Sequence, residues 1–245
     1  MQHVLSSRYF YVKIPAILSC SILYGLFGLT ANTLAAEKGK PAERKISRIL
    51  FLGNSITKHG PAPHIGWTGD WGMAASALDK DYVHVVARSL ADKNGKAPEV
   101  MAVSIAAFER KFGDYEVAKN LNKALEFKPD TIVMAIGENV SPLKTKQSQA
   151  IFKSRLLKLL AAFRADNNPA IIIRSSFWPD KVQDDIFKQC AMEVGGTYVD
   201  ISSLCKDESN YARSERDYKH AGVAAHPGDK GMKAIAEAIL KAMNN

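Results

Sequence analysis

The sequence predicts an α/β fold, a three-layer α/β/α sandwich built around a five-stranded, mostly parallel sheet. Five short apolar runs show little alternation of polar and apolar residues, which is typical of strands buried on both faces. Helical patterns lie between them, and repeated alternation of strand and helix indicates a parallel sheet with helices on both sides. With 245 residues, 47% of them hydrophobic and 24% charged, the chain is long enough for one domain with a full core.

The strands are expected, in chain order, at residues 46–53, 99–105, 130–137, 170–177 and 197–203. Two amphipathic helices are expected at residues 151–163 and 232–243, where apolar side chains share one helical face. The first face comprises Phe152, Leu156, Leu159, Leu160 and Phe163, and the second Met232, Ile235, Ile239 and Met243. These stripes predict core contacts and need no functional explanation.

Residues 1–35 have the outline of a secretory signal peptide. Arg8 and Lys13 precede an apolar stretch from Ile14 to Leu29, no acidic residue is present, and small residues lead up to Ala35, after which we expect cleavage. An uncleaved membrane anchor is the alternative, since the apolar stretch with its tail nearly reaches the roughly 20 residues that span a bilayer. We therefore expect export to the periplasm or the extracellular space, with no stable membrane insertion once the signal peptide has been cleaved.

Residues 36–45 are then expected to be a flexible N-terminal segment, and residues 46–245 the folded domain. The chain has a net charge of +8, of which the signal peptide carries two positive charges. The remaining charges are scattered rather than clustered, so they indicate a solvated basic surface and no nucleic-acid partner. Cys190 and Cys205 remain after cleavage. Export permits a disulfide between them, although two buried thiols are the preferred interpretation.

Chemically useful side chains follow three of the predicted elements. Ser55 follows the first strand in "GNS", Asn139 follows the third in "GEN", and His226 stands just before the last helix. The carboxyl ends of parallel strands meet at one edge of a sheet, where such folds hold their functional groups. An imidazole can take the proton of a serine hydroxyl, and N–H donors from Ser55, Asn139 and one further backbone position could stabilise an oxyanion. Each signal alone also fits a plain turn or helix start.

Three motifs of the chain resemble the SGNH (GDSL-like) hydrolases. "FLGNSIT", "IGEN" and "HPGDKGM" are similar to the first, third and last blocks of that family, and the resemblance covers residues 46–243. It implies a flavodoxin-like α/β/α fold and a carboxylic ester hydrolase that acts on esters of lipids or sugars. It also implies that Ser55 is the nucleophile, that His226 is the base and that Asn139 is a donor of the oxyanion hole.

Two departures from the family pattern bear on the mechanism. Ala107, in "VSIAAFER", stands where the second block supplies a glycine whose N–H completes the oxyanion hole; alanine keeps this N–H, provided that its backbone angles suit the role. Val223 stands where the family usually has an aspartate, three residues before the histidine. Either the serine and the histidine act as a dyad, or another acceptor orients the imidazole: a main-chain carbonyl, Asp200, Asp217 or Glu138.

Residues 58–82 are expected to line one side of the active site. Four glycines, two prolines and two tryptophans make this stretch a long loop beside the nucleophile. Trp67 and Trp71 could offer flat apolar faces to a sugar ring, with core filling as an equally weighted alternative. His64 and Glu138 complete the set of residues predicted to bind substrate.

No metal or other cofactor is expected. His59 and His64 lack a third ligand nearby. The first strand is followed by neither a P-loop nor a G-x-G-x-x-G motif, so no nucleotide site is indicated.

The functional hypothesis is an exported serine esterase that hydrolyses small acyl esters, acetyl esters above all, on carbohydrate. The partner is then a small acyl ester or an acylated carbohydrate. A lipid-directed, lysophospholipase-like esterase of the same fold is one alternative, although residues 58–82 contain few large aliphatic side chains. A catalytically weak carbohydrate-binding module is another, because Val223 replaces the family aspartate.

Overall fold

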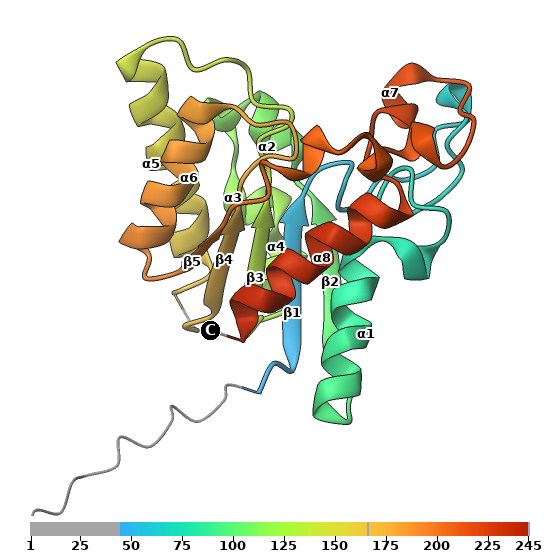
Figure 1. Cartoon of the computed structure of the whole chain (residues 1–245). Coiled ribbons are helices and arrows are strands. Elements are labelled where there is room, and N and C mark those ends of the chain that lie inside the picture. The colour runs from blue at the N-terminus through green and yellow to red at the C-terminus, as the bar shows by residue number, and fades with distance from the viewer. Residues whose placement is uncertain (1–44, 166, 245) are drawn as a thin grey trace, which may run out of the picture. The chain divides into compact units, whose positions relative to one another are not determined.

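The computed structural model describes residues 45–165 and 167–244 and confirms the predicted α/β/α sandwich (Figure 1). The strands are β1 (Arg48–Gly53), β2 (Glu99–Ser104), β3 (Thr131–Ala135), β4 (Ala170–Arg174) and β5 (Thr197–Val199). They run parallel in the order β2-β1-β3-β4-β5, which is the flavodoxin-like arrangement. The signal peptide expected at residues 1–35, and all of the segment 36–45 except Lys45, lie outside the described residues and remain predictions.

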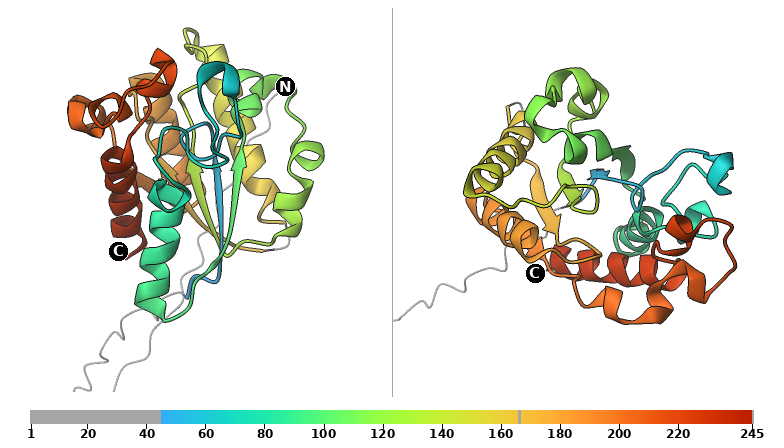
Figure 2. Two further views of the ribbon diagram at one scale, coloured as in Figure 1. Left: turned by 90° about the vertical axis from the view of Figure 1, so that its right-hand side faces the viewer. Right: turned by 90° about the horizontal axis from the view of Figure 1, so that it is seen from above.

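Helices cover both faces of the sheet. They are α1 (Tyr82–Asn94), α2 (Ala106–Arg110), α3 (Val117–Asn120), α4 (Asn122–Glu126), α5 (Lys146–Ala162), α6 (Lys181–Glu193), α7 (Ala221–Ala224) and α8 (Asp229–Met243). Helices α1 and α8 lie on one face of the sheet, and α2, α4, α5 and α6 on the other (Figure 2). The side chains of each group pack into the apolar cluster on their own face. Within residues 45–165 and 167–244, no helix is both long and apolar enough to cross a membrane.

The helices expected at residues 151–163 and 232–243 are found within α5 and α8, which begin earlier, except that α5 ends at Ala162 and Phe163 is its C-cap. α5 starts after Thr145, whose hydroxyl oxygen accepts the N–H of Ser148 at 3.0 Å while the Ser148 side chain reaches back to Thr145. This polar first turn has no apolar periodicity, so the sequence pattern places the start of the helix too late.

Burial differs between the central and the edge strands. Every residue of β3 is buried, as is every residue of β1 and β4 except the first. β2 forms an edge of the sheet, and its residues are half-buried or exposed. The expectation that all five runs are buried on both faces is therefore wrong for β2 and also for β5, the other edge strand, in which only Val199 is buried. Among the described residues, no further strand covers the outer side of either.

β1 ends at Gly53 as predicted, whereas the other four strands end earlier than predicted. β3 ends at Ala135 because Gly137, with a φ of 130°, turns the chain out of the sheet. β5 has three residues because the side chain of Asp200 accepts the N–H of Ser202 at 2.8 Å and starts a turn. Turns, rather than longer strands, therefore occupy the carboxyl edge of the sheet.

The order of the strands creates a topological switch point at this edge. The chain leads from β1 to α1 on one face of the sheet and from β3 to α5 on the other. The neighbouring carboxyl ends of β1 and β3 are thus a topological switch point, where open α/β sheets bind their ligands. Ser55 follows β1 and Asn139 follows β3, so the topology places both residues beside this switch point.

Cys190 and Cys205 are free thiols in the structure. Cys190 is buried, and burial raises the pKa of its thiol to about 12. Cys205 is only half-buried, so the preferred interpretation of two buried thiols holds fully for Cys190 alone.

Candidate active site

Ser55 lies in a tight turn that begins where β1 ends. The carbonyl oxygen of Asn54 accepts the N–H of Thr57 at 3.0 Å, and the side-chain oxygen of Asn54 accepts the N–H of Ile56 at 3.1 Å. Gly53 permits this turn, because a Cβ there would lie 1.8 Å from the Thr57 hydroxyl oxygen. The turn leaves Ser55 half-buried at the carboxyl edge of the sheet.

Ser55 and His226 are far apart in the chain but form a hydrogen bond. Ser55 Oγ lies 2.8 Å from His226 Nε2, and His226 Nδ1 lies 2.7 Å from the carbonyl oxygen of Gly222. A carbonyl oxygen only accepts, so Nδ1 carries the proton of the neutral ring and Nε2 accepts from the Ser55 hydroxyl. In this tautomer the imidazole can act as a general base toward Ser55.

The Gly222 carbonyl can accept from the imidazole because α7 ends just before His226. The backbone N–H of His226 donates to Val223 instead, at 3.0 Å, and the last carbonyls of a helix have no partner within it. The Val223 side chain is 1% exposed and packs with Trp67 and Met73 in an apolar cluster. A main-chain carbonyl is therefore the acceptor at the imidazole. Val223, which stands at the family's aspartate position, packs in the core instead.

None of the carboxylates considered for this task has a hydrogen bond to His226 in the structure. Asp200 accepts the backbone N–H of Ser202, Asp217 is exposed, and Glu138 is bound in a buried network of side chains. Glu138 nevertheless acts on His226 through its negative charge.

Burial lowers the pKa of His226 below its ordinary value. The hydrogen bond to Gly222 and the charge of Glu138 act in the opposite direction, whereas the nearby His59 adds to the lowering. Trp178 contributes to the burial, since its ring meets the imidazole edge-to-face with the ring centroids 5.7 Å apart. The imidazole is therefore neutral at neutral pH, which is the form that a general base requires.

Asn139 lies in the turn after β3 and is held by two residues of α2. Its Nδ2 donates to Glu109 Oε2 at 2.9 Å, and its Oδ1 accepts from Arg110 Nη2 at 2.9 Å. Gly137 starts this turn with a positive φ, and a Cβ there would lie 1.9 Å from Ser176 Oγ. Glu109 uses only one hydrogen of Nδ2, and an amide nitrogen has two to donate.

Ala107 is the second residue of α2, where backbone N–H groups have no acceptor within the helix. α2 is tied to the Ser55 turn, because the N–H of Ile105 donates to the carbonyl of Gly53 at 2.6 Å. Ala107 is not among the residues with a positive φ, so an alanine fits there without backbone strain. Its role as an oxyanion donor remains a prediction, as do the roles of Ser55, His226 and Asn139.

A network of buried polar side chains lies beneath these residues. Arg174 Nη1 donates to Glu138 Oε1 at 2.8 Å, and Asn54 Nδ2 bridges Glu138 Oε2 at 2.6 Å and Glu109 Oε1 at 3.1 Å. Glu138 is 3% exposed, so the structure does not support its predicted contact with substrate. Asn54, Glu109 and Arg174 were not predicted as site residues, although Asn54 and Arg174 stand at the carboxyl ends of strands and Glu109 lies in the helix that follows β2.

The loop 58–82 packs its tryptophans together. Trp67 is 6% exposed, donates its indole N–H to the carbonyl of His59 at 3.0 Å and lies edge-to-face against Trp71, with the ring centroids 5.6 Å apart. The prediction that Trp67 offers a face to a sugar is wrong in this structure, because the ring fills the core under the loop. Trp71 is half-buried, and its substrate role remains a prediction.

Two histidines of the loop differ in their surroundings. His64 is exposed in a 3₁₀ turn, η1 (Pro63–Ile65), and its substrate role stays a prediction. His59 is half-buried and close enough to His226 to influence the pKa of that residue. In the part of the chain that the structure describes, no three side chains of metal-binding type gather at one point.

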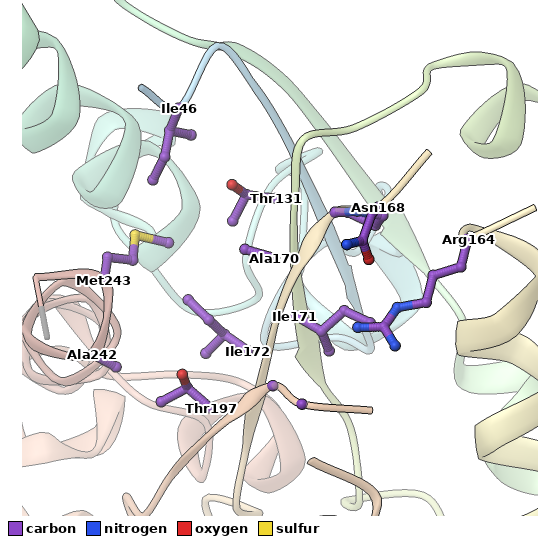
Figure 3. Close-up of a pocket in the computed structure, with 13 residues that line it drawn as sticks. Ile46, Thr131, Arg164, Asn168, Ala170, Ile171, Ile172, Thr197, Ala242 and Met243 are labelled. Carbon is purple, nitrogen blue, oxygen red and sulfur yellow. The ribbon is translucent and has the colours of Figure 1, made fainter. Parts of the chain in front are cut away.

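A separate cavity of about 270 Å³ lies at the opposite edge of the sheet (Figure 3). Thr131, Ala170 and Thr197, which line it, are the first residues of β3, β4 and β5. Since Ser55 and Asn139 follow the carboxyl ends of strands, this cavity is not part of the site described above.

Comparisons with known proteins agree with this architecture. Among solved structures, a two-domain esterase active on acetylated mannans is similar with a TM-score of 0.55 and 16% sequence identity, over 81% of this chain and 49% of that one. This chain thus spans about half the length of that esterase. A lipase/acylhydrolase from Enterococcus faecalis is similar with a TM-score of 0.52 and 16% identity, over 79% of this chain and 94% of that one. A search of curated protein sequences gives no match.

At such low sequence identities the solved structures show only a shared fold, whereas a match to a family model rests on the sequence. The model of the GDSL-like lipase/acylhydrolase family matches residues 51–234, a stretch that begins within β1 and ends within α8. It includes the serine, the asparagine and the histidine that the fold brings to one edge of the sheet. The chain therefore belongs to the GDSL-like lipase/acylhydrolase family, the SGNH hydrolases, and is a carboxylic ester hydrolase.

Proposed function

We propose that this protein is an exported serine esterase that removes small acyl groups, acetyl groups above all, from carbohydrate. Ser55 is the nucleophile, His226 the general base, and Asn139 and the backbone N–H groups of Ser55 and Ala107 form the oxyanion hole. The observation that carries the proposal is the hydrogen bond of 2.8 Å between Ser55 Oγ and an imidazole whose other nitrogen is held by the Gly222 carbonyl.

In the acylation half of the reaction, Ser55 Oγ attacks the ester carbonyl while its proton passes to His226 Nε2. The carbonyl π electrons move onto oxygen, and the three N–H donors stabilise the negative charge that develops there. The protonated imidazole then gives its proton to the departing alcohol oxygen, and an acyl-serine remains.

Deacylation repeats these steps with water. Nε2 takes a proton from the water as its oxygen attacks the acyl carbonyl, and then returns a proton to Ser55 Oγ as the carboxylic acid leaves. In both halves the Gly222 carbonyl accepts from Nδ1–H, which keeps the ring oriented. The buried charge of Glu138 favours the imidazolium that forms transiently, in place of a carboxylate bonded to the ring.

The surroundings of Ser55 favour a small acyl group. The backbone N–H of Met73 donates to the Ser55 carbonyl at 2.8 Å, yet the Met73 side chain is buried, as is that of Trp67. Leu78, which is exposed, lies at the far end of the loop beside α1. A long acyl chain would therefore find little apolar surface on this loop, and this counts against a lipid-directed esterase.

The carbohydrate part of the proposal has two supports. Export, expected from residues 1–35, gives access to polymers and envelope material. The similar two-domain esterase is active on acetylated mannans, and its fold is shared by this chain. The half-buried rings of Trp71 and Trp178 are the aromatic side chains that we propose to contact a sugar.

The first test is the hydrolysis of p-nitrophenyl esters from acetate to octanoate by protein purified from cells that express the full chain. We expect acetate to be the best substrate and Ser55→Ala to lower kcat by about 10³-fold or more. Ser89→Ala is the matched control, because Ser89 lies on α1 and its hydroxyl donates to Val85 within the same helix. Equal rates for wild type and Ser55→Ala would contradict the proposal.

The second test separates the remaining alternatives. We expect release of acetate from acetylated mannan and no release of fatty acid from lysophospholipid. Fatty-acid release with poor turnover of the acetyl ester would indicate the lipid-directed esterase. Binding of the polysaccharide that persists in Ser55→Ala, without turnover by the wild type, would indicate a binding module.

A further inference from the structure

Two adjacent residues of α2 hold opposite ends of the Asn139 side-chain amide. Glu109 Oε2 accepts from Asn139 Nδ2 at 2.9 Å, and Arg110 Nη2 donates to Asn139 Oδ1 at 2.9 Å. Glu109 is buried, whereas Arg110 is exposed. The amide is therefore held between a side chain from the core and a side chain from the surface.

The chemistry of the two partners permits one orientation of this amide. An ionised carboxylate only accepts hydrogen bonds, and a guanidinium only donates them. Rotation of the amide by 180° would place Nδ2 against Arg110 and Oδ1 against Glu109, so that both bonds would be lost. In the observed orientation Glu109 uses one hydrogen of Nδ2, and the second hydrogen remains for the substrate oxygen.

Glu109 also joins the two turns that carry the proposed catalytic groups. Its Oε1 accepts the backbone N–H groups of Gly137 at 2.7 Å and Asn139 at 3.2 Å, and the side-chain amide of Asn54 at 3.1 Å. Asn54 builds the turn of Ser55, so one carboxylate connects that turn to the turn of Asn139. With four donors on two oxygens, Glu109 is well satisfied as an anion, although burial and the charge of Glu138 raise its pKa.

We infer that Glu109 and Arg110 are positioning residues that select the productive orientation of the Asn139 amide. This inference rests on the proposed function, because it requires Asn139 to be a donor to the oxyanion. An oxyanion donor acts mainly in the transition state, so a defect in its orientation lowers kcat and leaves KM nearly unchanged.

Arg110→Met is the leading test, because an exposed residue can be changed without disturbing the core. We expect kcat for p-nitrophenyl acetate to fall by roughly 5- to 50-fold, the coupling expected within one hydrogen-bond network. Arg110→Lys, which keeps a donor, should recover part of the loss. Lys111→Met is the matched control, since it removes the same charge from the next exposed position and should leave kcat unchanged.

A double-mutant cycle identifies the route of the effect. Asn139→Ala alone is expected to lower kcat by about 10²- to 10³-fold. Adding Arg110→Met to Asn139→Ala should then change kcat by less than about 2-fold, because no amide is left to orient. Glu109→Gln should behave in the same way in the Asn139→Ala background, provided that thermal unfolding shows it to be folded.

The outcomes separate this inference from the proposed function. If Asn139→Ala costs 10²-fold or more while Arg110→Met is silent, or adds its full effect to Asn139→Ala, the positioning role is wrong and the esterase mechanism stands. A rise in KM alone in Arg110→Met would assign Arg110 to substrate binding and also overturn the inference. If Ser55→Ala retains full activity, the proposed function itself fails.

Discussion

His226 determines how the rate of the proposed reaction depends on pH. Burial, with help from His59, lowers the pKa of the imidazole below its ordinary value of 6.5. The neutral ring is the active form, and it is lost when the pH falls through this lowered pKa. We therefore expect the acidic limb of the profile of kcat/KM against pH to have an apparent pKa below 6.5.

His59→Asn tests the electrostatic part of this argument. Removing the charge of His59 takes away one of the influences that lower the pKa of His226, so the acidic limb should move to higher pH. His64→Asn is the control, because His64 is exposed and its charge is not among the influences on His226. An acidic limb above pH 6.5 in the wild type would contradict the lowering of the His226 pKa by burial.

Val223 allows a second test at the scale of one residue. Val223→Asp restores the side chain that the family usually has at this position, yet the site lies in an apolar cluster and is 1% exposed. We expect the free energy of unfolding to fall by more than about 2 kcal/mol, since an unpaired carboxylate is buried, with no gain in kcat. Urea unfolding at neutral and at acidic pH should show a smaller loss at acidic pH, where the new carboxyl group is neutral. A gain in kcat would mean that the new carboxylate reaches His226.

At the scale of elements, the turns that end the strands carry the proposed catalytic residues. Gly137 combines a φ of 130° with a Cβ position 1.9 Å from Ser176 Oγ. Gly137→Ala should therefore lower the free energy of unfolding by more than about 2 kcal/mol, through backbone strain and a steric clash. It should also lower kcat, because the turn that places Asn139 must move.

Gly95→Ala is the control for this prediction. Gly95 also has a positive φ, at the end of α1, but a Cβ there would meet nothing within 4 Å. Gly95→Ala should lower the free energy of unfolding only by the cost of the left-handed backbone conformation, about 1 to 2 kcal/mol, and kcat should not change. Equal effects of both substitutions on stability and kcat, measured by thermal unfolding and initial rates, would contradict the role of the Gly137 turn.

These turns also determine which parts of the fold and of the candidate site could be predicted from the sequence. Apolar runs predict the central strands well, because β1, β3 and β4 are buried on both faces. Strands of this kind consist almost entirely of apolar residues, so they stand out in the sequence. The same rule extends β3 through Ile136 and Gly137, since a turn made by one glycine does not interrupt an apolar run. Ser55, Asn139 and His226 could be predicted because short motifs mark them.

The acceptor at His226 could not be predicted from side-chain letters. It is a carbonyl group, which every residue has, and only the end of α7 makes the one at Gly222 available. The role of Trp67 was equally ambiguous, since the sequence does not distinguish a tryptophan in the core from one on a binding surface. For both residues, three-dimensional context decides the role.

At the scale of the whole molecule, one buried network joins the carboxyl ends of four strands. Asn54 follows β1, Glu109 lies in α2 after β2, Glu138 follows β3, and Arg174 ends β4. Charged residues are usually exposed, so no pattern in the sequence marks Glu109 and Arg174 as buried. The network fixes the turns of Ser55 and Asn139 relative to each other, and it depends on a single cation among its four members.

Arg174→Met should therefore destabilise the protein strongly. Burial by itself would raise the pKa of Glu138, but the adjacent Arg174 outweighs this effect and lowers it. Without the guanidinium, a buried carboxylate is left unpaired, and we expect the free energy of unfolding at neutral pH to fall by about 3 to 5 kcal/mol. Lys181→Met, which breaks an exposed ion pair with Asp185, should cost less than about 0.5 kcal/mol.

The pH dependence of this loss distinguishes charge from packing. In the wild type, Glu138 has a lowered pKa and contributes stability above its unfolded value of 4.5, which is lost as the pH falls through the folded value. In Arg174→Met the folded pKa of Glu138 is raised instead, so its charge destabilises the fold above that value and is relieved by protonation. The difference in unfolding free energy between the two proteins should therefore shrink as the pH is lowered from 7 toward 4.5, measured by urea unfolding. A difference that is constant over this range would mean that Arg174 stabilises the fold through packing, and that the turns of the active site do not depend on its charge.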